Sequence, residues 1–431
     1  MNPVIVIPSY WNRGEDAVEF GDVCAYDHAT PVLKPVPELE VCLDSLEDVR
    51  GILRVVVLLV APADCEADAR ARVDGICRAH RDLNPLVIGS AEAEVIAGAV
   101  ERCVPRLGGS AIALRGYGAI RNMGLAVASV LGHDVVVFLD DDQVVPNGDF
   151  LIDALYGLGM KTRQNLPILA KSGYFLDTDG SPYAPQGDLP LRDRFWSKRV
   201  SFNQWMHRAL STTRISRSNY VCGGCFALAG EAFTHVAFDP TITRGEDLDY
   251  LLNMRMMGYD VWFDNAWCVR HVPPDDSSHA TRFLQDVYRW EYEIAKLGRA
   301  NATIGMRQVR PESLRPYPAD WLDGGNVRRR VLLTSLIRML AGPERGRYAS
   351  ILFRRRHEAQ GWAASVAGTY FELLTYWPQI MSFLWDNMLI ARRVVNMGTP
   401  NDYGACVRPG AAHGPSTGLA SSAVSWGGHR E

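Results

Sequence analysis

Three consecutive carboxylates at the end of an apolar run are the residues of this chain best suited to chemistry. The run covers residues 135–139, and Asp140, Asp141 and Asp142 follow it directly. Such a run predicts a strand buried on both faces, as in a parallel sheet covered by helices. Adjacent carboxylates repel one another, and Mg²⁺ or Mn²⁺ relieves that repulsion because these ions prefer oxygen ligands. Ligands bind at the carboxyl ends of strands in open α/β sheets, so the triplet predicts a metal-assisted site; a solvated acidic turn is the plain alternative.

Three other polar groups can contribute to the same site. Arg121 lies in the glycine-containing start of a predicted helix, where it can face a diphosphate. Glu246 and Asp247 open a second predicted helix, whose dipole favours ionised acids. His271 follows a short predicted strand, and a neutral imidazole can complete a metal shell that carboxylates begin. Each group also has a structural explanation. The glycines near Arg121 can serve a tight helix start, Glu246 and Asp247 can cap a helix, and His271 can be a surface histidine. His279 is the rival of His271 for the same role.

Strand-like and helical segments alternate before these motifs and between them, which is the pattern of an α/β fold. The predicted strands cover 4–7, 53–60, 86–88, 135–140, 219–229 and 261–263, and the predicted helices cover 39–46, 66–80, 116–131 and 245–257. From about residue 282 the pattern is helical as far as residue 397. We therefore expect a catalytic domain over 1–300, an α-helical region over 301–400 and a disordered tail, rich in Gly, Ser and Ala, over 401–431.

Composition and charge narrow the class of protein. The 431 residues are 47% hydrophobic and 22% charged, as in ordinary soluble proteins, and the net charge of -4 gives no reason to expect nucleic acid as a partner. Nine scattered cysteines predict free thiols in a reducing compartment, hence a cytoplasmic protein. The N-terminus lacks the features of a signal peptide, and no apolar run is long enough to span a membrane.

Taken together and in this order, the motifs resemble the GT-A glycosyltransferases, most closely the inverting enzymes of family 2. The resemblance covers about residues 3–275. Its motifs are the strand end at 6–10, the helix start at 119–125, the strand end at 138–142, Gly223-Gly224, Gly245-Glu246-Asp247 and His271. It implies a Rossmann-like nucleotide-diphospho-sugar transferase fold, with a mixed sheet flanked by helices, and an enzyme that moves a sugar, a hexose in our expectation, from a UDP- or GDP-sugar to an acceptor hydroxyl.

The resemblance also implies roles for single residues. The nucleotide-sugar site would comprise Pro8, Ser9 and Tyr10 at the base, Arg121 near the phosphates, Asp140 at the ribose, and Asp141, Gly223 and Gly224. Asp142 would bind the Mn²⁺ or Mg²⁺ ion directly, with His271 and Asp140 as further metal ligands, and the ion would stabilise the leaving diphosphate. Asp247, or with less support Glu246, would take the proton from the acceptor hydroxyl.

Two departures from the family pattern leave parts of this prediction open. Residues 59–64 supply only the late Asp64 where the family commonly has an acidic pair, so recognition of the base is in doubt. An insert over 15–37 separates the first strand from its helix. A histidine metal ligand also occurs in retaining GT-A enzymes that make glucosyl- or mannosyl-glycerate compounds, which are the alternative to inversion.

Other features allow more than one interpretation. Trp196, Phe202 and Trp205 indicate an acceptor-facing segment or a packed loop. Cys222 and Cys225 have the spacing of a redox or zinc pair, but no second pair lies at zinc-finger distance. Arginine clusters beside the apolar segment 370–397 fit contact with an anionic membrane surface, which would place the protein at the inner membrane face. A helical core packed on the catalytic domain, or a homodimer interface, explains them better.

Two other function classes compete with a glycosyltransferase. A nucleotidyltransferase would carry a glycine- and lysine/arginine-rich loop after the first strand, where this chain has Pro8-Ser9-Tyr10-Trp11. A catalytically inactive sugar- or nucleotide-binding module would lack one of the acids, and all of them are present. The sequence leaves the sugar, the base, the acceptor and the oligomeric state open.

Overall fold

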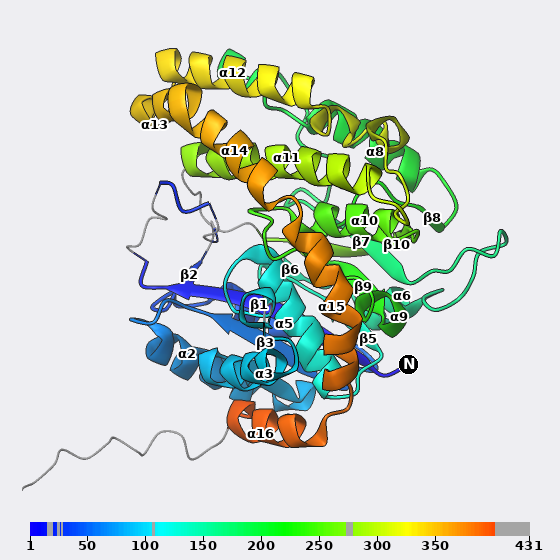
Figure 1. Ribbon diagram of the computed structural model, residues 1–431. Coiled ribbons are helices and arrows are strands. Elements are labelled where there is room, and N and C mark those ends of the chain that lie inside the picture. The colour runs from blue at the N-terminus through cyan, green and yellow to red at the C-terminus, as the bar shows by residue number, and fades with distance from the viewer. Residues whose placement is uncertain (15–19, 24–25, 27–28, 106–107, 273–278, 401–431) are drawn as a thin grey trace, which may run out of the picture. The chain divides into compact units, whose positions relative to one another are not determined.

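In the residues that the computed structural model describes (1–14, 20–23, 26, 29–105, 108–272 and 279–400), ten strands form one mixed sheet (Figure 1). The spatial order is β4-β3-β1-β5-β9-β7-β10-β6, with β2 beside β1 and β8 beside β10. The strands are β1 (Pro3–Asn12), β2 (Thr30–Pro31), β3 (Val55–Val60), β4 (Pro85–Ile88), β5 (Val135–Phe138), β6 (Gln143–Val144), β7 (Ala170–Leu176), β8 (Ile215–Arg217), β9 (Phe226–Ala229) and β10 (Val261–His271).

The direction of the strands decides which chain segments meet at one edge. Strand β1 is parallel to β3 and β5, whereas β9 is antiparallel to both β5 and β7. Strand β10 is parallel to β7. The carboxyl ends of β1, β5 and β10 therefore lie at the same edge as the residues that lead into β9.

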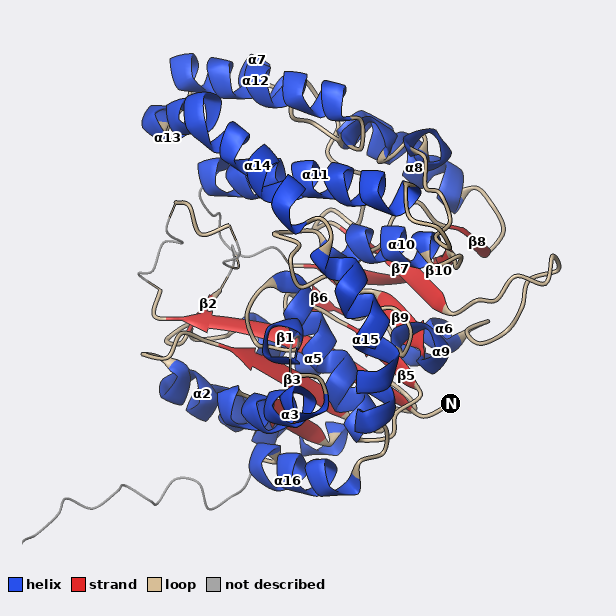
Figure 2. Cartoon of the chain, in the orientation of Figure 1, coloured by secondary structure: helices blue, strands red, loops and turns tan. Residues whose placement is uncertain are grey.

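Helices cover both faces of the sheet (Figure 2). Alternate residues of a strand point to opposite faces. Accordingly, Val4 and Val6 pack in the same core as α3 and α5, while Ile5 and Ile7 pack with α1 and α2. The helices up to the end of the predicted catalytic domain are α1 (Glu38–Leu46), α2 (Glu66–Ala79), α3 (Ser90–Cys103), α4 (Gly108–Ala111), α5 (Tyr117–Val130), α6 (Phe150–Leu155), α7 (Leu191–Arg194), α8 (Arg199–Leu210), α9 (Gly230–Phe233), α10 (Glu246–Met256) and α11 (His279–Asn301), with a 3₁₀ turn at Arg81–Leu83.

The C-terminal region is helical, and it packs on the sheet domain. Helices α11 to α14 lie together at the top of Figure 1, and α15 descends from them past α5 to α16. Trp377 of α15 is fully buried and donates a hydrogen bond from Nε1 to Phe233 O at 2.8 Å, and Tyr370 Oη donates to Ala237 O at 2.8 Å. The helices are α12 (Gly324–Ala341), α13 (Arg345–Ser350), α14 (Arg356–Val366), α15 (Thr369–Leu384) and α16 (Met388–Gly398), with 3₁₀ turns at Pro311–Leu314 and Ala319–Trp321 and a π-helical turn at Ile351–Arg355.

Residue 300 does not separate two compact units, because Met1–Pro400 forms a single one. The predicted tail over 401–431 lies outside the described residues. None of the helices in the described part of the chain combines the length and the apolar character that a membrane span requires.

Three predicted strands have clearly different bounds in the structure. The predicted strand 4–7 extends over Pro3–Asn12, because β1 pairs with β3 as far as Tyr10 and with β2 at Trp11 and Asn12. Of the predicted strand 219–229, only Phe226–Ala229 is a strand. The residues before it form a turn in which Cys225 N donates to Cys222 O at 2.9 Å, since Gly223 and Gly224 favour a turn over a ladder. The predicted strand 261–263 continues to His271, because β10 pairs with β7 as far as Arg270 and with β6 at His271.

Gly118 in the first turn of α5 shows how closely the site-bearing helix packs, and it gives a first prediction. A Cβ atom at this position would clash with the backbone carbonyl oxygen of Asp239. We expect Gly118→Ala to lower the free energy of unfolding, measured in urea, by about 1–3 kcal/mol, which is the usual cost of overpacking. Gly98→Ala is the matched control, because the nearest atom to its Cβ is Arg102 Nη1 at 3.7 Å; it should stabilise α3 by about 0.5–1 kcal/mol. Equal effects of both changes would contradict the close contact.

Candidate active site

The predicted site residues gather at one edge of the sheet, although they come from six separate segments, one of which is α5 with Arg121. Ser9 and Tyr10 lie near the end of β1, and the aspartate triplet follows β5. His271 ends β10, where its Cα is the register partner of Gln143, the residue after the triplet. The segment leading into β9 and the first turn of α10 complete the site.

Asp142 and His271 are in direct contact. His271 Nε2 lies 3.1 Å from Asp142 Oδ2, and Val272 N donates to Asp142 O at 2.8 Å. The hydrogen bond to Asp142 raises the pKa of His271, and burial opposes the rise. Both side chains are partly exposed, at 19% for Asp142 and 31% for His271. A carboxylate and an imidazole that meet at the surface are a suitable start for a divalent cation site.

Asp140 is directed toward Arg121 and away from that pair. Arg121 Nη2 donates to Asp140 Oδ1 at 2.7 Å, and its Nε donates to Glu246 Oε1 at 3.2 Å. The guanidinium is 6% exposed and lies 5.0 Å above the ring of Phe138. Arg121 therefore holds the end of β5 and the start of α10 together. Its buried Nη1 has no hydrogen-bond partner among the described residues, and the contact of Arg121 with a diphosphate stays a prediction.

Asp141 has a third, separate environment. Ser9 Oγ donates to Asp141 Oδ2 at 2.7 Å and accepts a hydrogen bond from Trp11 Nε1 at 2.8 Å. Burial raises the pKa of Asp141, and the neighbouring charge of Asp142 adds to the rise. Pro8, Ser9 and Tyr10 are all buried, with Tyr10 at 8% exposure, so the contact of this strand end with a nucleotide base stays a prediction.

An aromatic stack extends from the end of β1. The rings of Tyr10 and Tyr26 are parallel within 1° with centroids 3.3 Å apart, and the ring of Tyr26 lies 5.1 Å from that of Tyr117. Tyr26 belongs to the insert over 15–37. Of this insert, residues 15–19, 24–25 and 27–28 lie outside the described part of the chain. The insert thus reaches the candidate nucleotide site.

The glycine turn before β9 is required by close packing. A Cβ atom at Gly224 would clash with the side-chain amide of Gln143, and one at Gly223 would lie 3.1 Å from Arg121 Nη2 and 3.5 Å from Asp247 Cβ. The glycines therefore let the turn lie against the acids and Arg121.

Glu246 and Asp247 differ in their contacts. Glu246 is 8% exposed and paired with Arg121, whereas within the described part of the chain Asp247 accepts a hydrogen bond from Leu248 N, at 2.6 Å. Burial raises the pKa of both carboxyls; the charge of Arg121 opposes the rise at Glu246, and that of Arg289 opposes it at Asp247. A raised pKa suits a general base that works near neutral pH.

Arg289 is a site residue that sequence reasoning missed. It lies on α11, is 7% exposed, and donates from Nη2 to Gly245 O at 3.2 Å. Gly245 has φ +68°, and a Cβ atom there would clash with the Arg289 guanidinium. Phe175, whose ring centroid lies 5.5 Å from that of His271, was missed as well. Both residues are far from the motifs in sequence, and a single arginine or phenylalanine gives no local signal.

A pocket of about 500 Å³ lies beside the site. Phe175 lines it and contacts His271. Tyr220 and Tyr317 also line it. Burial raises the pKa of both tyrosines, and the negative charge of the nearby Asp247 adds to the rise. Trp196 and Phe202 belong to its lining, whereas Trp205 is 5% exposed and packs on Phe263 in the core. Lys198 brings an ammonium group to the pocket, 3.4 Å from Asp286 Oδ2.

The cysteine pair Cys222 and Cys225 does not form a disulfide. All described cysteines are free. Burial raises the pKa of both thiols, and a raised pKa makes a thiol unreactive. A redox role for this pair has no support in its environment.

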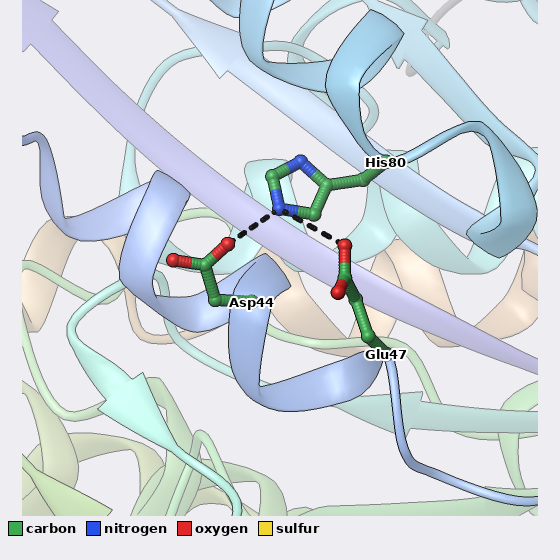
Figure 3. Close-up of side chains that lie close together, drawn as sticks. All are labelled: Asp44, Glu47 and His80. Carbon is green, nitrogen blue, oxygen red and sulfur yellow. Dashed lines mark hydrogen bonds and ion pairs between the residues drawn. The ribbon is translucent and has the colours of Figure 1, made fainter.

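A different cluster of potential ligands lies at the end of α1 (Figure 3). Its members are Asp44, Glu47 and His80, whose ligand atoms lie within 4.8 Å of one another. Among the described residues, the predicted ligands Asp140, Asp142 and His271 do not lie this close together. His80 Nε2 lies 2.8 Å from Asp44 Oδ1, and its Nδ1 lies 2.9 Å from Ile76 O. Both ring nitrogens face oxygen acceptors, so a protonated His80 in an ion pair between two helix ends fits best.

This ion pair predicts a pH dependence of stability. Burial lowers the pKa of His80, but the hydrogen bonds to Ile76 O and Asp44 outweigh it and the pKa is raised. The stabilisation is therefore complete below the unfolded-state pKa and is lost as the pH rises through the folded-state pKa. We expect His80→Gln to cost about 0.5–1 kcal/mol near pH 5.5 and less near pH 8.5, in urea unfolding. The exposed His207 gives the control His207→Gln; a larger loss at high pH would refute the ion pair.

No model of a protein family matches the sequence, and no curated protein sequence is significantly similar to it. The fold is similar to several solved structures at a distance. The mannosyltransferase PcManGT from Pyrobaculum calidifontis, in complex with GDP-Man and Mn²⁺, is 15% identical with a TM-score of 0.40 over 91% of this chain and 86% of its own. GalNAc-T7 with UDP, GalNAc and Mn²⁺ is 14% identical with a TM-score of 0.40 over 70% of this chain and 51% of its own. Glucosyl-3-phosphoglycerate synthase from Mycobacterium tuberculosis, with Mn²⁺ and UDP-Glc, is 14% identical with a TM-score of 0.34 over 66% of this chain and 74% of its own. At these scores the likeness is remote, and the function has to be argued from the site.

Proposed function

We propose that this chain is a metal-dependent glycosyltransferase of the GT-A type, which transfers a sugar from a nucleoside diphosphate sugar to an acceptor hydroxyl. One observation carries the proposal: Asp142 and His271, 129 positions apart, meet at 3.1 Å at the sheet edge that also holds Arg121 and Asp247. A solvated acidic turn would not need a histidine from another strand, a buried arginine and a second acid pair beside it.

The residues present fit Mn²⁺ or Mg²⁺. Asp142 would hold the ion, because carboxylate oxygen suits these cations. His271 would add a nitrogen ligand, which Mn²⁺ accepts more readily than Mg²⁺. When bound, the ion neutralises the charge that grows on the leaving diphosphate. Arg121 would add its unpartnered Nη1 donor to the same group, and Asp140, held by Arg121, would contact the ribose. Tyr10 would lie at the nucleotide base, next to Tyr26.

Asp247 is the better candidate for the general base. Glu246 accepts a hydrogen bond of 3.2 Å from Arg121 Nε. If Glu246 took up a proton during the reaction, the positive charge of Arg121 would lose one of its ion-pair partners. Asp247 has no arginine within salt-bridge distance in the described structure and adjoins the pocket lined by Tyr220 and Tyr317. A base on the acceptor side that deprotonates the attacking hydroxyl favours inversion at the anomeric carbon.

The pocket of about 500 Å³ is the proposed acceptor site. Its lining combines five aromatic residues with five charged ones, which are Asp193, Lys198, Arg199, Asp286 and Arg338, so it can pack against a ring-shaped ligand and fix its orientation by polar contacts. Burial lowers the pKa of Lys198 to about 8, and Asp286 opposes this, so the pocket presents a cation to the acceptor at neutral pH.

The test is hydrolysis and transfer measured over a panel of UDP- and GDP-sugars, each with Mn²⁺, with Mg²⁺ and with a chelator. We expect metal-dependent release of the nucleoside diphosphate from one donor, so that either UDP or GDP is released but not both. The proposal would be refuted if calorimetry detected no binding of any nucleoside diphosphate in the presence of either metal. The anomeric configuration of the product, read by NMR, then separates inversion from the retaining alternative.

A further inference from the structure

A second, arginine-lined pocket lies at the other end of the helix that carries the candidate base. Arg217 from β8, Arg255 from α10, and Arg307 and Arg310 after α11 line a pocket of about 410 Å³. From Asp247 to Arg255 the helix rises by about 12 Å, at ~1.5 Å per residue. The pocket is therefore separate from the candidate active site, and the two share α10.

The charges of this pocket are not balanced. Asp260 is the acid of the lining; its Oδ2 lies 2.8 Å from Arg217 Nη2 and its Oδ1 4.0 Å from Arg255 Nε. One carboxylate among four arginines leaves the lining strongly positive. Arg307 and Arg310 are exposed, and neither has an ion pair within 4.0 Å among the described residues. Solvation alone can support exposed arginines, so these two do not by themselves indicate a ligand.

Arg255 supplies the independent observation. It is 7% exposed, and its Nη2 donates to Ser218 O and to Asn219 Oδ1, both at 2.7 Å. Its buried Nε has no hydrogen-bond partner among the described residues. Burial lowers the pKa of Arg255 to about 10, and the charges of Arg217 and Arg307 add to this although Asp260 opposes it. Burying a charged group with an unused donor is unfavourable unless an anion compensates it, and Asp260 compensates Arg255 only in part because it pairs more closely with Arg217.

The end of α10 explains only part of this arrangement. The partial negative charge of a helix C-terminus attracts a cation in the last turn, which accounts for Arg255 itself. It does not account for three more arginines from two other segments around the same cavity.

We propose that this pocket binds the phosphate group of a small soluble molecule. The planar fork of arginine donors matches phosphate oxygens, and charge-assisted hydrogen bonds of this kind are strong. Phosphate would accept hydrogen bonds from the exposed Arg307 and Arg310 and would lie beside Arg255, which also lines the pocket. Because Arg255 also holds Ser218 and Asn219, the bound phosphate would steady the segment that continues to Tyr220 and Gly223 in the candidate active site.

The experiment is calorimetric titration of the full chain with inorganic phosphate at constant ionic strength. We expect one site in the wild-type protein and at least about 10-fold weaker binding in the double variant Arg307→Gln/Arg310→Gln, which changes only exposed residues. The control Arg163→Gln/Arg329→Gln removes the same charge from exposed residues outside the pocket and should bind phosphate as the wild type does. An equal loss in the control, or no binding to the wild type, would overturn the proposal.

Two further arms separate this site from its rivals. With Mn²⁺ present, phosphate should bind Asp142→Asn as it binds the wild type; a loss there would mean that the phosphate is held through the metal ion of the candidate donor site, which overturns the second site and leaves the proposed function standing. Wild-type protein should not co-sediment with phosphatidylcholine vesicles that contain phosphatidic acid. Binding to these vesicles without binding to free phosphate would assign the pocket to a lipid headgroup and overturn the soluble ligand.

Discussion

Replacement of Asp142 by asparagine is expected to weaken Mn²⁺ binding by at least about 10- to 100-fold, which is the loss known even for groups that only support a metal ligand. The substitution keeps the size of the side chain and removes the charge that faces His271 Nε2 at 3.1 Å. Metal-dependent turnover of the donor should fall with metal affinity. Calorimetric titration with Mn²⁺ and a donor hydrolysis assay measure the two effects.

The control for this prediction is Glu47→Gln. Glu47 belongs to the cluster with Asp44 and His80, whose ligand atoms lie within 4.8 Å of one another, so it is the rival position for a cation. We expect Glu47→Gln to bind Mn²⁺ as the wild type does. Loss of binding in Glu47→Gln, with normal binding in Asp142→Asn, would move the metal site to α1 and remove the basis of the proposed function.

Replacement of Asp247 by asparagine should reduce the rate of sugar transfer by about 10²- to 10⁴-fold, the usual contribution of a general base. Donor and metal affinity should stay within about threefold, because no hydrogen bond joins Asp247 to Asp142 or His271 among the described residues. The pKa of Asp247 is raised by burial, so wild-type activity should fall as the pH drops through that pKa. This acid limb of the pH profile should vanish in the variant.

Glu246→Gln distinguishes the two acids. It removes the charge that pairs with Arg121 Nε at 3.2 Å, so we expect weaker donor binding and lower stability, with the acid limb of the pH profile retained. Should Asp247→Asn keep full transfer activity while Glu246→Gln loses it at unchanged donor affinity, Glu246 would be the base.

Much of the fold could be predicted because its signals are local. The apolar runs before Asp140 and at 53–60 predicted β5 and β3, and the helical spacing at 39–46 matched α1 (Glu38–Leu46). The alternation of strands and helices predicted the α/β class, and the resemblance to GT-A glycosyltransferases implied the mixed sheet flanked by helices that the structure has. The segment 219–225 was wrongly predicted as a strand, because two glycines and a turn hydrogen bond prevailed over the apolar pattern.

The sequence by itself determined the order of the motifs and the acidic end of β5, since both follow from neighbouring residues. Only the tertiary structure decided that the three aspartates have different partners: Arg121 for Asp140, Ser9 for Asp141 and His271 for Asp142. These partners are 19, 132 and 129 positions away. Sheet pairing and helix packing set such distances, and no periodicity within a short segment encodes them.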